Sequence, residues 1–352
     1  MKNFISVSIF LILLFTGVII NGCINNKNSS HLLQGKVYVA NEEGGSVSMI
    51  DLLDSLKNTT IDISDSGKMF MAHNVQVAPD GKSVWVTAVP MDSNGINQLV
   101  VIDQGSGTIK KRIYLGKDLH VAHVVLDDES KNAFVTAKDP NQVIQVNAVT
   151  YEVVRKFDLG AGHSPHGIRY AKGKLYIANM DAKSMSVIDI AEGKLTDIPL
   201  GGVVVQTAIT QDGKFVLASL YDTKEVIRYE LQSGEIKRIP LPANAQGPIQ
   251  LYATPDSKKL YVADQGELMN RPASNKVFVI DISTAKVTNT ITVGNKAHGV
   301  VVSKDGKTVY VTNSLDNTVS VIDAATQKVR NTVLVGKGPN GISYWFKTGG
   351  MP

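Results

Sequence analysis

The chain has 352 residues, of which 43% are hydrophobic, and a formal net charge of +4 at pH 7. This much apolar sequence is enough to bury a large core. The charge is close to neutral and no basic run stands out, so the chain lacks the electrostatic footprint of a nucleic-acid-binding protein. We therefore expect no nucleic-acid partner.

The N-terminal segment has its own pattern. Lys2 precedes an apolar run over residues 4–20, and Asn21 and Gly22 lead into Cys23, the only cysteine in the chain. A short charged region followed by an apolar region and a small residue is typical of a secretory signal peptide. The lone cysteine directly after it resembles the lipobox of bacterial-type lipoproteins. This resemblance implies a signal peptide at 1–22, cleavage before Cys23 and a lipid on its thiol.

A lipid on Cys23 would make the membrane a partner of the chain and residues 23–34 a polar tether. The alternatives are an uncleaved anchor helix or an ordinary signal peptide. Each version predicts an extracytoplasmic domain, and the lipoprotein version predicts one anchored to the cell membrane, either periplasmic or on the cell surface. A single cysteine allows no intramolecular disulfide, so stability has to come from packing.

From residue 35 onward, short runs rich in Val, Ile and Tyr alternate with Gly, Asp and Asn turns, which indicates an all-β fold. One sequence unit recurs along this part of the chain at a period of about 40 to 50 residues. Its full copies begin at His73, His123, His166, Gln206, Gln250 and His298.

Each copy contains four short apolar runs, which is the pattern of a propeller blade with four strands. The piece that begins at residue 35, before the first full copy, lacks the first run of the unit, and the run at 340–346 lacks the other three. We expect these two pieces to form one blade and close the ring, which predicts a seven-bladed β-propeller over residues 35–346. Residues 347–352 would then be a tail.

Four tetrapeptides at the second run of the unit carry a family resemblance. They are Tyr38–Asn41, Tyr176–Asn179, Tyr261–Asp264 and Tyr310–Asn313. They resemble the repeats of the YVTN-family β-propellers, which are named for this sequence and are common in extracytoplasmic proteins. The resemblance implies the fold and little about function, because one fold carries many functions.

The first strand of each blade lines the central channel of a propeller, so the residues that open these strands form a ring at one mouth. We call the face with this mouth the upper face. Four of the seven ring residues are histidine, and the full ring is His73, His123, His166, Gln206, Gln250, His298 and Asn340. Two more histidines, His120 and His163, lie three residues upstream of ring positions. Six of the seven histidines in the chain are therefore predicted to lie on the upper face.

Converging neutral imidazoles suit copper, zinc, iron and nickel. The pattern thus predicts a site for a metal, with copper or zinc favoured as the ion, or for a small ligand. The candidate ligands are His73, His120, His123, His163, His166 and His298. The sequence does not decide whether such a protein would be a carrier, a sensor or a redox enzyme.

Three alternatives stay open. The histidines can be structural residues copied from repeat to repeat, and no carboxylate adjoins the ring in sequence to support metal ligands. The chain can be a metal-free adhesion scaffold, using the long upper-face loops 90–97 and 265–275 to hold a protein or glycan. It can also be a relative of the propeller-type lyases and lactonases, or bind haem through a ring histidine.

Overall fold

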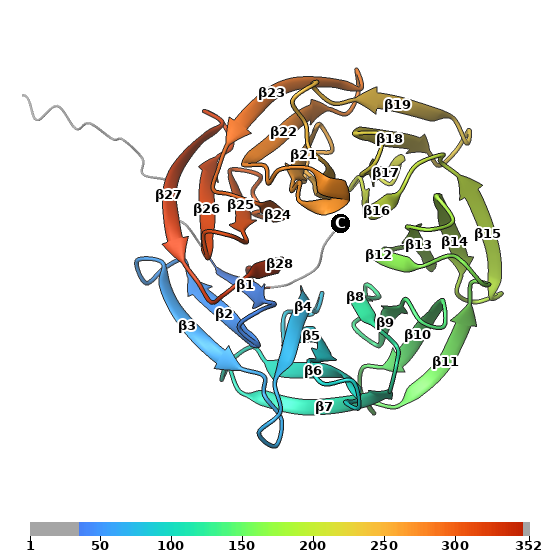
Figure 1. The fold of residues 1–352 in the computed structure, drawn as a ribbon, viewed down its shortest axis with the longest axis vertical. Helices are drawn as coiled ribbons and strands as arrows, with labels where there is room; N and C mark the ends of the chain where they lie inside the picture. The colour runs from blue at the N-terminus through green and yellow to red at the C-terminus, as the bar shows by residue number, and fades with distance from the viewer. Residues whose placement is uncertain (1–34, 348–352) are drawn as a thin grey trace, which may run out of the picture. The chain divides into compact units, whose positions relative to one another are not determined.

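The computed structural model describes residues 35–347, which form seven antiparallel sheets of four strands arranged around a central channel (Figure 1). This confirms the predicted seven-bladed β-propeller. The predicted signal peptide, Cys23 and the tether lie outside the described residues, as does most of the predicted tail. Among residues 35–347 there is no helix with the length and hydrophobicity to cross a membrane.

The blades follow one another in chain order, and the first strand of each blade is the innermost one. The first three are β28 (Pro339–Trp345), β1 (Lys36–Asn41), β2 (Ser46–Asp51), β3 (Lys57–Asp62); β4 (Phe70–Val77), β5 (Ser83–Pro90), β6 (Asn97–Asp103), β7 (Ile109–Gly116); and β8 (Val121–Leu126), β9 (Asn132–Ala137), β10 (Gln142–Asn147), β11 (Val153–Asp158).

The remaining four blades repeat the same arrangement. They are β12 (Pro165–Ala171), β13 (Lys174–Asn179), β14 (Ser184–Asp189), β15 (Lys194–Pro199); β16 (Val204–Ile209), β17 (Phe215–Leu220), β18 (Glu225–Glu230), β19 (Ile236–Pro240); β20 (Pro248–Ala253), β21 (Lys259–Asp264), β22 (Lys276–Asp281), β23 (Lys286–Thr292); and β24 (Ala297–Val302), β25 (Thr308–Asn313), β26 (Thr318–Asp323), β27 (Lys328–Leu334). A short 3-10 turn, η1 (Leu268–Asn270), lies in the loop between β21 and β22.

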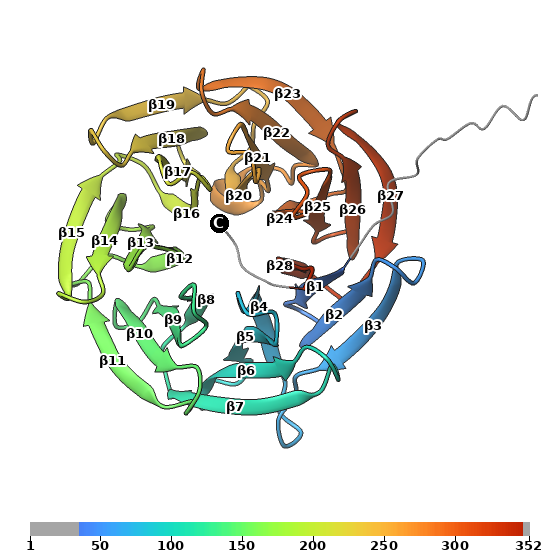
Figure 2. The ribbon, with the colours of Figure 1, turned by 180° about the vertical axis from the view of Figure 1, so that it is seen from behind.

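The first blade is built from both ends of the propeller. Strand β28 pairs antiparallel with β1, with Val39 opposite Ile342 and Val37 opposite Tyr344. In Figure 2 the red strand β28 accordingly lies beside the blue strand β1. The blade therefore joins the C-terminal strand to the N-terminal ones, which leaves the ring with only short strand edges.

Burial explains why the second strand of each blade is so apolar. Strand β25 is buried at every position and β9 at every position but its first, because each sheet packs against neighbouring blades on both faces. One hydrophobic cluster, for example, joins Trp85 of one blade to Val135 of the next. The outermost strands, such as β3, are mostly exposed and carry polar residues.

The ring residues are aimed into the channel by irregularities in the innermost strands. The pairing of each innermost strand with its neighbour shifts register at or beside the ring residue. Bulges of this kind bend a strand and redirect a side chain, and they are frequent next to functional sites. Gly341 also permits close contact between blades, because a Cβ there would lie 2.8 Å from the Cα of Asn74.

Candidate metal centre

The seven predicted ring residues all lie on innermost strands, one in each blade. Five are buried, and His73 and His166 are half-buried. The ring predicted from the repeat is therefore present, and its histidines lie on β4, β8, β12 and β24.

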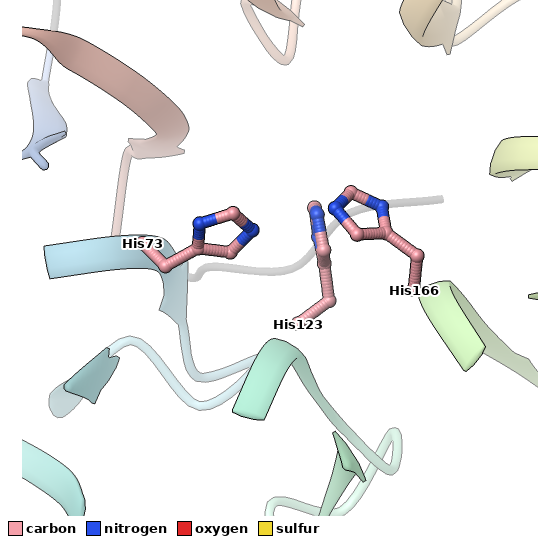
Figure 3. A group of neighbouring side chains, drawn as sticks. All are labelled: His73, His123 and His166. Atoms are coloured by element: carbon pink, nitrogen blue, oxygen red, sulfur yellow. The ribbon is translucent and has the colours of Figure 1, made fainter. Parts of the chain in front are cut away.

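Three of these histidines converge. His73, His123 and His166 come from three consecutive blades, and one ring nitrogen from each lies within 4.8 Å of the other two. Their ring centroids are 4.8 to 5.7 Å apart. Figure 3 shows the three side chains reaching toward one another across the channel. Within the described residues this is the one group of three side chains with metal-ligand spacing.

Existing hydrogen bonds decide which nitrogens are left for a ligand. His73 Nδ1 donates to Glu42 Oε1 at 2.7 Å, and His166 Nδ1 donates to the Val205 carbonyl at 3.0 Å. Both bonds fix the proton on Nδ1 and leave Nε2 with a free lone pair. The Nε2 atom of His73 is buried and has no hydrogen-bond partner among the described residues. Imidazoles held this way are oriented as metal-binding histidines are.

Glu42 is a site residue that the sequence analysis missed. It follows β1, and its second oxygen accepts a hydrogen bond from Asn340 Nδ2 at 2.6 Å. Burial by itself raises the pKa of Glu42, but the neighbouring His73 and these hydrogen bonds lower it to about 2. An ionised carboxylate therefore supports His73. The sequence feature that could have pointed to Glu42 is its position on an upper-face loop, in the blade next to that of His73.

His123 has a different partner. Its Nδ1 lies 3.3 Å from the side-chain nitrogen of Gln206, the ring residue of a blade two positions further on. Its Nε2 is buried without a hydrogen-bond partner in the part of the chain that the structure describes. Burial, together with the nearby histidines, lowers the pKa of His123 well below its usual value. His123 is therefore neutral at pH 7.

His298 lies near the three histidines but outside the group that they form. It is buried, and its Nδ1 has no partner among residues 35–347. Burial lowers the pKa of His298 to about 3, although the Glu42 carboxylate opposes this, and burial next to His73 lowers that of His166 to about 4. These imidazoles keep lone pairs for a cation at neutral pH.

His120 and His163 are not brought into the group. His120 is an exposed residue whose Nδ1 pairs with Asp139 at 2.9 Å. Both ring nitrogens of His163 are occupied, one by the Gly160 carbonyl and the other by Asp197 on the outermost strand of its blade. These two predicted ligands thus have other partners, and both lie in the loops before the innermost strands rather than on the strands.

The two long loops project from the upper face, as expected from the order of the strands. In the 265–275 loop, Arg271 donates to the backbone oxygens of Tyr221, Asp222 and Gln246, and Glu267 pairs with Lys296 at 2.6 Å. These charged side chains therefore hold the loop against its neighbours.

A separate cavity of about 490 Å³ lies at the lower end of the channel, and none of the ring histidines lines it.

Fold and site together define a seven-bladed β-propeller with a histidine cluster at one mouth of its channel. Residues 174–347 match the family model of the YNCE-like beta-propellers, and the match and the blade number are consistent with a YVTN-type propeller. A comparison with curated proteins finds no match.

Two solved structures show the same fold. Hydrazine synthase of Kuenenia stuttgartiensis is similar with a TM-score of 0.66 and 15% identity, over 78% of this chain and 92% of that one. Virginiamycin B lyase from Staphylococcus aureus is similar with a TM-score of 0.64 and 16% identity, over 79% and 92%. At such low identity the likeness concerns the fold alone.

Proposed function

We propose that this chain is a lipid-anchored, extracytoplasmic propeller that binds one copper or zinc ion through His73, His123 and His166. The observation that carries the proposal is the convergence of three ring nitrogens within 4.8 Å. Three protein ligands with a fourth position open is the arrangement of catalytic zinc sites, and imidazole also suits copper. The anchor and the location rest on the sequence up to Cys23.

The surroundings of the three histidines support a metal rather than a purely structural role. Structural histidines are expected to pair both ring nitrogens or to leave one in solvent. Here His73 and His123 each bury an unpaired Nε2, which is costly unless a ligand compensates. A carboxylate behind one ligand and a backbone carbonyl behind another are the usual outer partners of metal-bound imidazole.

Metal analysis of the purified full chain after exposure to copper and to zinc tests this proposal. We expect about one equivalent of bound metal per chain, and less than roughly a tenth of an equivalent of either ion would overturn the proposal. Carrier, sensor and redox roles share this prediction.

A binding scaffold is the second candidate function. The observation that favours it is a set of exposed apolar side chains on the two long upper-face loops: Met91, Ile96, Leu268 and Met269. Exposed apolar side chains can mark contacts with a protein or another partner. A chain that carries no metal but binds a partner through these loops would support the scaffold.

A further inference from the structure

Gln206 is the ring residue whose side chain lies next to His123, one of the three candidate ligands. It is fully buried on β16, and its side chain contacts both His123 and Arg169. The orientation of its amide decides which of these groups receives a hydrogen bond and which gives one. That choice matters because a metal ligand has to offer a lone pair.

The contacts of the amide oxygen fix the orientation of Gln206. Its Oε1 accepts from the Thr207 backbone N–H at 2.9 Å and from Arg169 Nη1 at 3.4 Å. Both partners are donors, so turning the amide over would place its NH₂ group against two donors. The NH₂ group therefore faces His123, with Nε2 of Gln206 at 3.3 Å from Nδ1 of the ring.

The protonation of His123 follows from this contact. A neutral imidazole has one donor and one acceptor nitrogen, and the nitrogen that accepts from Gln206 is Nδ1. The proton then lies on Nε2, which is the nitrogen open to a metal because Gln206 occupies Nδ1. His73 and His166 are the opposite case, since their Nδ1 atoms donate to Glu42 and to the Val205 carbonyl.

The Nε2–H tautomer of His123 reduces electrostatic repulsion in the metal-free site. Three converging lone pairs would repel one another in a buried site, whereas one N–H among two lone pairs does not. A bound cation reverses the requirement, because it needs a lone pair from every ligand. His123 then has to carry its proton on Nδ1, where it would face the NH₂ group of Gln206.

We propose that Gln206 is a positioning residue that holds His123 in the Nε2–H tautomer while the site is empty. Binding of a metal through all three histidines is then coupled to a tautomer exchange at His123 and to rotation of the Gln206 amide. This inference rests on the proposed metal function for its consequence, but its first part concerns the metal-free protein alone.

Nitrogen-15 NMR of the histidine rings in the metal-free full chain tests the first part. We expect His73 and His166 to be protonated on Nδ1, and His123 on Nε2. His123 found with its proton on Nδ1 would overturn the inference. Because no metal is involved, this result is independent of whether the proposed function holds.

Gln206→Glu tests the consequence. A carboxylate can still accept from Thr207 and Arg169, and it also accepts from His123 Nδ1–H, so the ligating tautomer becomes the resting one. We expect the affinity for Zn²⁺ to rise about tenfold or more, since outer partners of histidine ligands change affinity by 10- to 100-fold. The ring nitrogen signals of His123 should also move to the Nδ1–H pattern without metal.

Gln250→Glu is the matched control, because Gln250 is a buried ring residue of the next blade and has no contact with His123 among the hydrogen bonds of residues 35–347. It adds the same charge to the ring. A clear gain in Zn²⁺ affinity for Gln206→Glu over Gln250→Glu supports the inference. Equal gains in both variants would show that the added negative charge alone raises the affinity, and this result would overturn the inference. If the wild-type chain binds no Zn²⁺, the metal function fails, and the NMR measurement alone decides the role of Gln206.

Discussion

Glu42 of the first blade accepts a hydrogen bond from His73 of the second blade, with 2.7 Å between Oε1 and Nδ1. The other Glu42 oxygen accepts from Asn340 on β28, the strand that completes the first blade. One carboxylate thus links the closure of the ring to the orientation of a candidate ligand. The position of His73 therefore depends on the blade built from both ends of the propeller.

Glu42→Gln should weaken metal binding by about 10- to 100-fold, because it removes the charged acceptor that orients the His73 ring. Competition with a chelator of known affinity measures the change. Glu43→Gln is the control, since Glu43 is the next residue and pairs with Lys337 at the surface. If both variants bind metal as tightly as the wild type, Glu42 does not support a ligand.

His166→Ala removes one of the three converging nitrogens and should lower the affinity for copper or zinc by more than about 100-fold, which exceeds the effect expected for an outer partner. Gln250→Ala is the comparison, because it truncates a buried ring residue outside the group of three. Gln206→Ala is unsuitable, given its contact with His123. Similar losses in the two variants would argue against the proposed ligand set.

The metal-free chain should lose stability as the pH falls from 7 to 5. His166 and His298 have pKa values lowered to about 4 and about 3, so the unfolded chain binds more protons than the folded one below about pH 6.5. Each such histidine then lowers the free energy of unfolding by about 2 kcal/mol at pH 5.

Urea unfolding of the metal-free chain at the two pH values measures this effect. His298→Gln should reduce the dependence on pH, because glutamine does not titrate. A wild-type unfolding midpoint that stays constant between pH 7 and pH 5 would show that these histidines are not buried in the neutral form.

Gly341→Ala should destabilise the propeller by about 1–3 kcal/mol, the usual cost of adding atoms to a packed interior. A Cβ at residue 341 would lie 2.8 Å from Asn74 Cα and 3.0 Å from the Val75 nitrogen, where β28 approaches β4. Gly105→Ala is the control, because its Cβ would meet only one side-chain atom, at 3.5 Å. Thermal unfolding compares the two, and equal melting temperatures would contradict the close contact.

Cys23→Ser should move the chain from the membrane fraction to the soluble fraction of cells, because it removes the thiol that a lipid would modify. Ser29→Ala, a change within the predicted tether, should leave the chain with the membrane. Fractionation followed by mass measurement of the N-terminal peptide checks both. A Cys23→Ser chain that stays membrane-bound would favour the uncleaved anchor helix.

The fold was predictable because every blade repeats the same local pattern. A copy whose sequence departs from the pattern can therefore be recognised from the other copies. The ring was predictable for the same reason, since Gln206 and Asn340 hold the same place as His73. The choice of partners within the ring was not. Glu42 and His73 meet across a blade boundary, and no repeat pattern encodes such a contact.

His163 shows the opposite limit. Its three-residue offset from His166 suggested a position at the channel, yet Asp197 on the outermost strand holds its side chain. Loop conformation decides this outcome, and neither strand periodicity nor repeat spacing describes loops. Strand periodicity therefore placed the seven ring residues on the innermost strands, but it did not determine the partners of side chains in the loops.

X-ray absorption spectroscopy of the copper- or zinc-loaded full chain tests the central claim most directly, because it reports the ligands of the bound ion. We expect three imidazole nitrogens at about 2.0–2.1 Å from a bound zinc ion, with one imidazole signal lost in His166→Ala. A bound ion without imidazole ligands, or one whose spectrum is unchanged by His166→Ala, would contradict this claim.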